Sequence, residues 1–355
     1  MRSHLSVLHL VGSWESDYFQ RLSTLYARDV ITPEGFAPRF LALSTDRRFR
    51  LGRSLDSLGA PFGLDELQAR IRGTDLVVSH LFCKSGMGAM RALFEDVLGL
   101  PLIGPRADTA MIATDKVWTR GIAAECGVAV ADGVRVARTE APDAPPLPLP
   151  LIVKPVDSDN SEGLSLVRDP SDWKAALAGA FAHGDDALVE RFVAGREIRA
   201  CVVERRGELF VPAVMEYPLR ADCPIREAGD KLAFDADGLP VAQTRRAAAK
   251  PVLPAPLTEA QREAVAGASR CLHRALGARH YSLFDFRLEA GTDRVVLLEA
   301  GLFWAFSRIS MISAMLAASG LDVAEEIGAL WRGAVGANEN GADVPARAVE
   351  ALELA

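Results

Sequence analysis

Residues 281–301, YSLFDFRLEAGTDRVVLLEAG, decide the fold, because they combine two apolar runs with one short turn. The runs Ser282–Leu288 and Val295–Glu299 predict strands, and the glycine and aspartate between them predict the turn of a hairpin. Each run carries one carboxylate, Asp285 in the first and Glu299 in the second. A hairpin that closes symmetrically places these two residues opposite each other or one residue apart.

Two carboxylates in an apolar sheet need a physical reason. Directly opposed Cβ atoms lie about 5 Å apart, and like charges at that spacing destabilise the pair. A shared proton, a basic partner or a divalent cation would relieve the repulsion. Mg²⁺ takes one or two carboxylates and completes its shell with substrate phosphates. A register shift that turns one carboxylate to solvent is the plain alternative, and the hairpin alone leaves all of these open.

Composition excludes several classes of protein. The 355 residues suit two or three packed units, and 40 basic against 47 acidic residues leave a net charge of −7. That balance gives no electrostatic footprint for nucleic acid. No apolar run approaches the roughly 20 residues of a membrane span, and no signal peptide precedes the first strand. The five cysteines are scattered, without a CxxC pair, which is typical of reduced thiols in a cytoplasmic protein.

The order of apolar segments predicts the domain organisation. Strands at 5–11, 38–44, 75–79 and 101–104 alternate with helices, which favours a parallel α/β sheet up to about residue 112. We expect an α/β protein (α+β in its later part) with four regions: a Rossmann-like substrate domain at 1–112, a central subdomain at 113–190, a C-terminal subdomain at 191–335 that includes a lid loop at 217–256, and a tail at 336–355.

Two further segments carry groups that suit a nucleotide. In LIVKPVDSDNSEG (151–163), Lys154 ends a strand before a small-residue turn, so it can reach phosphate oxygens while backbone N–H groups cap them. A strand-end lysine that faces water is the alternative, and the turn is not a P-loop. In ALVERFVAGREI (187–198), Glu190 lies inside a predicted strand and Glu197 follows seven residues later, after a turn. A strand edge can bind adenine through its backbone, and a carboxylate can accept from ribose hydroxyls; as ordinary exposed glutamates the two residues would need no explanation.

The order of these motifs resembles the ATP-grasp superfamily, and within it the D-alanine–D-alanine ligase-like branch. The resemblance covers residues 75–330 and rests on seven motifs in sequence: DK (115–116), IVKP (152–155), NSEG (160–163), LVERFVAGREI (188–198), DK (230–231), FDF (284–286) and LLEAG (297–301). It implies an ATP-grasp fold after the N-terminal domain.

The resemblance also implies a role for each matching residue. Lys116 and Lys154 would contact ATP phosphates, and Lys231 would reach the γ-phosphate from the lid. Asp285 and Glu299 would bind one or two Mg²⁺ ions, with Mn²⁺ as a substitute. The remaining positions are Asn160, Ser161 and Gly163 in a loop over the phosphates, Glu190, Arg191 and Val193 at the adenine, Glu197 at the ribose, and Ser310 at a substrate carboxylate.

The chemistry implied by the family is carboxylate activation. ATP would phosphorylate a small carboxylate, and an amine would attack the acyl phosphate to give an amide, ADP and phosphate. The partners are therefore small carboxylate and amine substrates, with neither nucleic acid nor membrane, and a homodimer is an expectation that comes from the family alone.

Three departures separate this chain from the family pattern. Gly301 stands where the family has asparagine, the turn that follows is replaced by LFWAFSR (302–308), and Leu283 stands where the ligases carry an arginine two residues before the metal aspartate. Losing that cation is costly for anionic intermediates. Arg308 is the replacement that we favour, whereas we expect Arg287 to be solvated.

These departures lead us to expect a ligase for amino acids or related small acids in a specialised biosynthetic pathway. A genuine D-alanine–D-alanine ligase is the alternative among ligases. A phosphotransferase that stops at a phosphorylated product and a nucleotide-binding protein with weakened catalysis are the alternatives of other classes.

Overall fold

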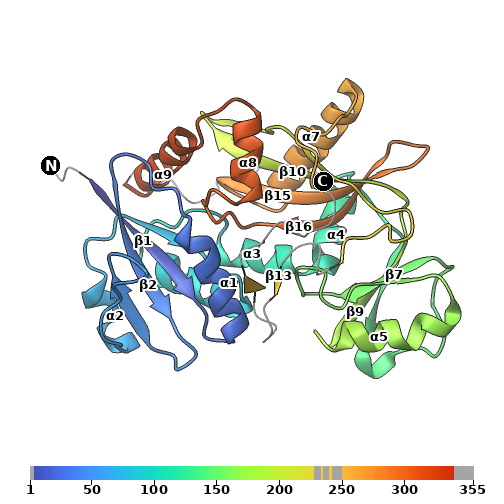
Figure 1. Ribbon diagram of the computed structural model, residues 1–355, viewed down its shortest axis with the longest axis horizontal. Helices are drawn as coiled ribbons and strands as arrows, with labels where there is room; N and C mark the ends of the chain where they lie inside the picture. The colour runs from blue at the N-terminus through green and yellow to red at the C-terminus, as the bar shows by residue number, and fades with distance from the viewer. Residues whose placement is uncertain (1–3, 228–232, 235–239, 242–249, 340–355) are drawn as a thin grey trace, which may run out of the picture.

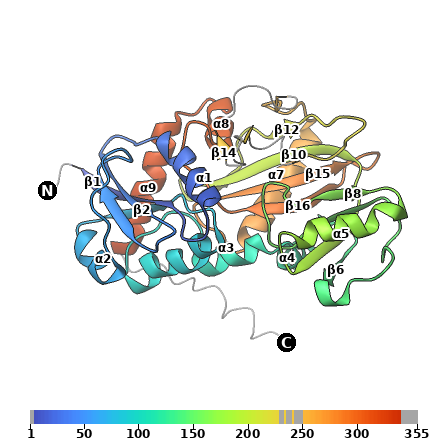
Figure 2. The same ribbon diagram turned by 60° about the horizontal axis from the view of Figure 1, so that its bottom comes forward.

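The computed structural model describes residues 4–227, 233–234, 240–241 and 250–339. Three main sheets divide this part of the chain, and Figures 1 and 2 show them side by side, with the N-terminal sheet at one end and the unit built on β7 and β9 at the other. The largest sheet, built on β10, β15 and β16, lies between them. It holds the hairpin predicted from residues 281–301.

The N-terminal unit is an α/β layer around a four-stranded sheet of order β3-β2-β1-β4. β1 pairs in parallel with both β2 and β4, as the alternating pattern predicts, but β3 is an antiparallel edge strand. Its elements are β1 (Leu5–Gly12), α1 (Asp17–Arg28), β2 (Phe36–Leu43), β3 (Phe49–Gly52), α2 (Leu64–Arg70), β4 (Leu76–Ser79) and the π-helical turns η1 (Gly86–Met90) and η2 (Leu93–Val97). The strand predicted at 101–104 is reduced to a single bridge between Val77 and Leu102.

Two helices lead into a smaller antiparallel sheet of order β6-β9-β7-β8. This unit presents Lys154, the last residue but one of β7, toward the largest sheet. The elements are α3 (Ala107–Thr114), α4 (Lys116–Glu125), β6 (Gly133–Ala137), η3 (Arg138–Glu140), β7 (Leu151–Pro155), β8 (Ser165–Val167), η4 (Pro170–Asp172), α5 (Trp173–Phe181) and β9 (Asp186–Arg191).

The largest sheet follows the order β11-β10-β15-β16-β5, with β12 paired to β10. Only β5 runs parallel to its neighbour, β16, so this is an antiparallel sheet with one parallel edge. Its elements and covering helices are β5 (Ala129–Val130), β10 (Gly195–Arg205), β11 (Glu208–Phe210), β12 (Met215–Tyr217), α7 (Glu259–Ala275), β15 (Tyr281–Glu289), β16 (Val295–Gly301), α8 (Met311–Ala318) and α9 (Val323–Glu339), with the short pair β13 (Ala233–Phe234) and β14 (Pro240–Val241) between β12 and α7.

Side-chain caps explain where several helices begin. Ser16 accepts a hydrogen bond from the Phe19 N–H at the start of α1, and Asp115 accepts from two N–H groups at the start of α4. Thr258 and Gln261 form a capping box at α7. Asp169 caps η4 in the same way and accepts from the Ser171 N–H.

The two faces of β15 enter different hydrophobic cores, since alternate residues of a strand point to opposite faces. Phe284 and Phe286 pack with residues of α4 and α7, whereas Tyr281 and Leu283 pack with residues of β1, β4, α8 and α9. Asp285 shares a face with Leu283. The apolar residues on both sides therefore fix which way the carboxylate points.

The predicted domain boundaries stay predictions, but one element crosses the last of them. α9 continues to Glu339, past the predicted boundary between residues 335 and 336. Among the described residues, no helix combines the length and apolar character needed to cross a membrane.

We expect the Phe286→Ala substitution to lower the free energy of unfolding by about 3–5 kcal/mol, because it empties a fully buried site in the central strand. Denaturant unfolding followed by circular dichroism measures the change. Val97→Ala is the control: its side chain is 72% exposed, so its effect should stay within about 0.5 kcal/mol. Equal effects of the two substitutions would contradict this account of the core.

Candidate active site

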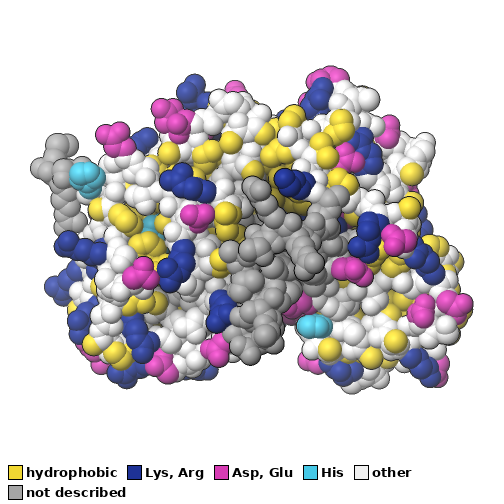
Figure 3. All heavy atoms as spheres, viewed as in Figure 1, with side chains coloured by type: hydrophobic (Ala, Val, Ile, Leu, Met, Phe, Trp, Pro, Cys, Tyr) yellow, Lys and Arg dark blue, Asp and Glu magenta, His cyan; other side chains and the backbone are white. Residues whose placement is uncertain are grey.

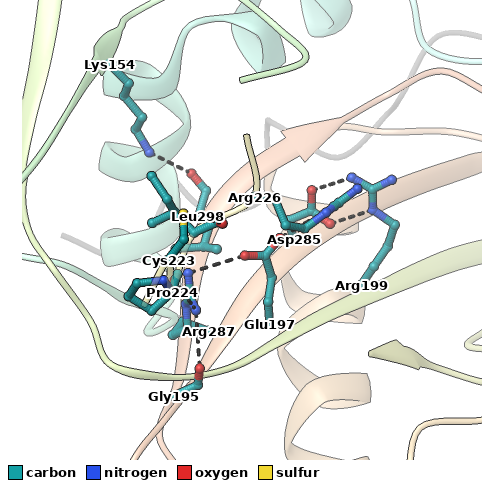
Figure 4. Close-up of polar contacts among 11 residues, drawn as sticks. Lys154, Gly195, Glu197, Arg199, Cys223, Pro224, Arg226, Asp285, Arg287 and Leu298 are labelled. Atoms are coloured by element: carbon teal, nitrogen blue, oxygen red, sulfur yellow. Dashed lines mark hydrogen bonds and ion pairs between the residues drawn. The ribbon is translucent and has the colours of Figure 1, made fainter. Parts of the chain in front are cut away.

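Three neighbouring strands place three charged side chains in one row. Asp285 on β15 lies opposite Glu299 on β16, in the register predicted from the hairpin, and Arg199 on β10 lies opposite Asp285 from the other side. Figure 4 shows the Arg199 guanidinium facing the Asp285 carboxylate. The repulsion between the two carboxylates is thus offset by a basic partner, one of the solutions that the sequence left open.

The Arg199–Asp285 pair is bidentate. Nε and Nη2 of the guanidinium each donate to one carboxylate oxygen, at 2.5 Å. Burial alone would lower the pKa of Arg199, but the charge and the hydrogen bonds of Asp285, together with the charge of Glu299, outweigh it and raise the pKa well above its usual value. Arg199 is therefore a fixed positive charge at this edge of the sheet.

A β-bulge in β16 next to this row leaves one backbone carbonyl free to accept a hydrogen bond from outside the sheet. Asp285 and Phe286 pair with Glu299 and Leu297, which leaves Leu298 as the extra residue. The Leu298 carbonyl accepts a hydrogen bond from Lys154 Nζ at 3.3 Å. The irregularity thereby joins the hairpin to the smaller antiparallel sheet.

Two cavities meet at the carboxylate pair. The larger has a volume of about 700 Å³ and lies among the N-terminal unit, the largest sheet and the start of α8; the smaller, of about 90 Å³, lies between the largest sheet and the unit built on β7 and β9. Lys116, Asp285 and Glu299 line both. A ligand that filled both cavities would pass directly over this pair.

The smaller cavity contains a buried charge cluster. Glu190 on β9 accepts from Lys154 Nζ at 2.5 Å and also from Arg120 on α4. Lys116 Nζ bonds the backbone carbonyls of Val156 and Ser158. Two lysines thus line the smaller cavity, and Glu190 compensates the charge of Lys154.

A second charge cluster surrounds Glu197. Its carboxylate is paired with Arg287 at 3.3 Å and with Arg226 at 3.4 Å, and the Arg226 guanidinium lies 3.5 Å from the centre of the Tyr217 ring. Arg287 also donates to two backbone carbonyls, as Figure 4 shows. The expectation that Arg287 is solvated is wrong: it is buried because Glu197 compensates its charge.

The loop after β7 adopts a backbone shape that suits close approach of a ligand. Asn160, Ser161 and Gly163 all have positive φ. A Cβ at Gly163 would lie 2.9 Å from the Gly179 carbonyl oxygen, so the turn tolerates no larger residue there without a shift. Asn160 lines the larger cavity and Ser161 the smaller. Gly163 lines neither cavity, and its role is to allow the backbone conformation of the loop.

The family model for the D-Ala–D-Ala ligase C-terminus matches residues 124–330, more than half of the chain. The chain belongs to the D-alanine–D-alanine ligase family. Its curated relatives include the D-alanine–D-alanine ligases of Gluconobacter oxydans, 30% identical over 67% of this chain and 73% of that protein, and of Acidiphilium cryptum, 32% identical over 64% of this chain and 69% of that protein.

Solved structures agree on the fold. The VanG D-Ala:D-Ser ligase of Enterococcus faecalis matches with a TM-score of 0.73 at 19% identity, over 94% of this chain and 99% of that one. A D-alanine–D-alanine ligase of Coxiella burnetii matches with a TM-score of 0.73 at 16% identity, over 96% of each chain. The ATP-grasp fold and the family together make this member an ATP-dependent ligase that forms C–N bonds.

The residues predicted from the family motifs fall into three groups. Most line at least one of the two cavities: Lys116, Lys154, Asn160, Ser161, Glu190, Arg191, Val193, Glu197, Asp285, Glu299 and Ser310. Ser310 precedes α8 and lies 2.9 Å from the hydroxyl of Ser313. Arg308 is exposed and lines neither cavity, which does not favour it as the missing cation. Lys231 lies outside the described residues.

Sequence reasoning missed Arg199 and Arg120. Each reaches its carboxylate from an element distant in sequence, 86 residues away for Arg199 and 70 for Arg120. The leucine at position 283 could have pointed to Arg199. Because that position lacks a cation, any arginine on the neighbouring strand is a candidate partner for Asp285.

The donor set fits one Mg²⁺ ion better than two. Carboxylate oxygens carry about four lone-pair sites, so Asp285 keeps acceptor capacity beside Arg199, and Glu299 adds a second carboxylate. Gly301 supplies no side-chain ligand, and the described residues contain no cluster of three or more His, Cys, Asp or Glu side chains suited to a metal. Phosphate and water oxygens would complete the shell of a single ion.

We expect Glu190→Gln to lower the free energy of unfolding by about 3 kcal/mol, because it leaves the Lys154 and Arg120 cations buried without a compensating charge. Denaturant unfolding without nucleotide measures this change. The control is Asp186→Asn on the same strand, whose partner Arg135 is largely exposed; it should cost at most about 1 kcal/mol. A loss for Glu190→Gln no larger than the control's would mean that the cluster is already screened.

Proposed function

We propose that this family member is a D-alanine–D-alanine ligase, which uses ATP to join two D-alanine molecules. One observation carries the proposal: the carboxylate pair lies where a small cavity with two lysines opens into a larger one. That arrangement suits a nucleotide whose terminal phosphate meets a small acid. The names of the curated relatives favour this activity over the specialised pathway expected from the sequence.

The reaction has two steps. A carboxylate oxygen of the first D-alanine attacks the γ-phosphorus, and the bond to the β-phosphate oxygen breaks to release ADP. The amino nitrogen of the second D-alanine then attacks the acyl carbon; the C–N bond forms, the acyl C–O bond breaks, phosphate leaves and the amine gives up a proton. The site residues act mainly by positioning and by charge compensation.

Lys116 and Lys154 would bind phosphate oxygens, since both line the smaller cavity together with Asp285 and Glu299. The loop with Asn160 and Ser161 would close over the phosphates and keep water from the acyl phosphate. A Mg²⁺ ion held by Asp285 and Glu299 would supply charge neutralisation at the phosphates. Lys231 stays a proposed contact to the γ-phosphate.

A ligase for a larger amine is the second candidate, and the wall of the larger cavity favours it. Phe82 and Phe303 pack edge to face with ring centres 5.4 Å apart, and Tyr18, Tyr26 and Trp304 also line the space. Aromatic walls favour apolar side chains. A cavity of about 700 Å³ has room for a substrate larger than alanine beside the phosphates.

Phosphate release from Mg-ATP, with mass spectrometry of the products, tests the proposal. We expect release that depends on D-alanine and a product with the mass of the dipeptide. A new amide with another amino acid pair would favour the second candidate. Tight Mg-ATP binding without product from any pair would favour a nucleotide-binding protein.

We expect Glu299→Gln to lower turnover at least about 100-fold, because it removes one of the two carboxylates proposed to hold the Mg²⁺ ion that would neutralise the phosphate charge. Glu263→Gln is the control, since that glutamate is exposed and paired with Arg270 on α7; its rate should equal that of the wild type. Unchanged turnover in Glu299→Gln would remove the carboxylate pair from the reaction.

A further inference from the structure

Arg199 stands beside the carboxylate pair on the wall of the larger cavity. It belongs to β10, the strand next to the one that carries Asp285 and Leu283. Its side chain keeps 16% of its surface exposed, although both hydrogen bonds to Asp285 are in place. The guanidinium is therefore held rigidly and still open to the cavity.

The guanidinium has donors left over. It carries five N–H groups, of which Asp285 engages two, through Nε and Nη2. Within the described part of the chain, no protein acceptor is bonded to Nη1. The guanidinium carbon lies 5.3 Å from the centre of the Tyr217 ring, which limits its movement. The face of a ring is not a conventional hydrogen-bond acceptor, so this contact leaves the remaining N–H donors available. A ligand in the cavity can use the remaining donors.

The other cations that line the larger cavity are bound elsewhere or exposed: Arg226 is paired with Glu197, Lys116 Nζ donates to two backbone carbonyls, and Lys250 is exposed. Position 283 is leucine, Arg287 is bound to Glu197 on the side of the smaller cavity, and Arg308 lies outside both cavities. Lys84 and Arg220 line the larger cavity but form largely exposed ion pairs at its rim. Arg199 is the described cation that directly contacts the carboxylate pair.

An anion that reacts here faces strong repulsion. Asp285 and Glu299 contribute two negative charges, and both the phosphates and the substrate carboxylate add more. Arg199 lowers the charge of the row by one and offers a planar fork that matches a carboxylate. We propose that Arg199 binds the carboxylate that is to be phosphorylated, from β10, in place of a cation at position 283.

This inference rests on the proposed function, and binding is therefore measured separately from turnover. The probe is D-alanine, titrated by calorimetry into the protein saturated with Mg²⁺ and a non-hydrolysable ATP analogue. Arg199→Met should weaken D-alanine binding at least about 30-fold, whereas the affinity for the ATP analogue should change less than about threefold. Arg199→Lys, which keeps the charge but not the fork, should restore part of the loss.

Arg205→Met is a matched control. Arg205 lies on the same strand, donates through Nε to both Glu326 oxygens at 2.9–3.0 Å and covers the Phe210 ring at 5.7 Å, but it lines neither cavity. The Arg205→Met variant should bind D-alanine with the same affinity as the wild type. Circular dichroism establishes that each variant is folded, and if Arg199→Met is not, Arg199→Lys alone decides, with about 10-fold weaker binding expected.

The outcomes separate the two proposals. Wild-type affinity in Arg199→Met, together with dipeptide formation by the wild type, would overturn the role of Arg199 and leave the ligase intact. Weakened binding in Arg199→Met, with no dipeptide from the wild type, would support Arg199 and overturn the proposed function. A wild-type protein that does not bind D-alanine would overturn both.

Discussion

The hydrogen-bonded register of β10, β15 and β16 is the constraint on which the site depends. It brings Arg199, Asp285 and Glu299 into one row across three strands. Like charges opposed on neighbouring strands destabilise a sheet, and the row is tolerated because a cation flanks it. Asp285 and Glu299 line both cavities and Arg199 lines the larger one, so the charges that are balanced within the sheet also face the cavities.

The hydrophobic cores maintain this register. A slip of one residue would turn Asp285 toward the core of α4 and α7 and bring Phe286 toward the cavity. The buried aromatic residues of β15 make such a slip costly, since several large side chains would lose their packing together. The bulge at Leu298 is confined to β16. Its carbonyl accepts a hydrogen bond from Lys154, so the bulge also contributes to the site. Figure 3 shows acidic and basic side chains mixed over the face in view.

Local patterns were enough to predict much of this architecture. Alternation within 281–301 predicts the hairpin and the pairing of Asp285 with Glu299, because both strands and their turn are consecutive in sequence. The partners of these carboxylates were not predictable in the same way. Arg199 reaches Asp285 only through pairing between β10 and β15, which β11 to β14 and α7 separate in the sequence. Nothing local to β10 distinguishes Arg199 from a solvated strand residue. Arg120 is hidden for the same reason, since it meets Glu190 by tertiary packing of α4. The environment of Arg287 was wrongly predicted because its compensating charge, Glu197, is also on another strand.

Positions 199 and 283 lie diagonally across the β10–β15 pair, and the residue at one affects which residue suits the other. Arg199 lies opposite Asp285 and Cys201 lies opposite Leu283, so residues 199 and 283 are diagonal neighbours on one face, about 7–8 Å apart at the backbone. A long cationic side chain at either position reaches the same carboxylate, and two at once would place like charges together. The two positions therefore constrain each other: a cation at one makes a cation at the other unfavourable, while Asp285 keeps a compensating charge in either case.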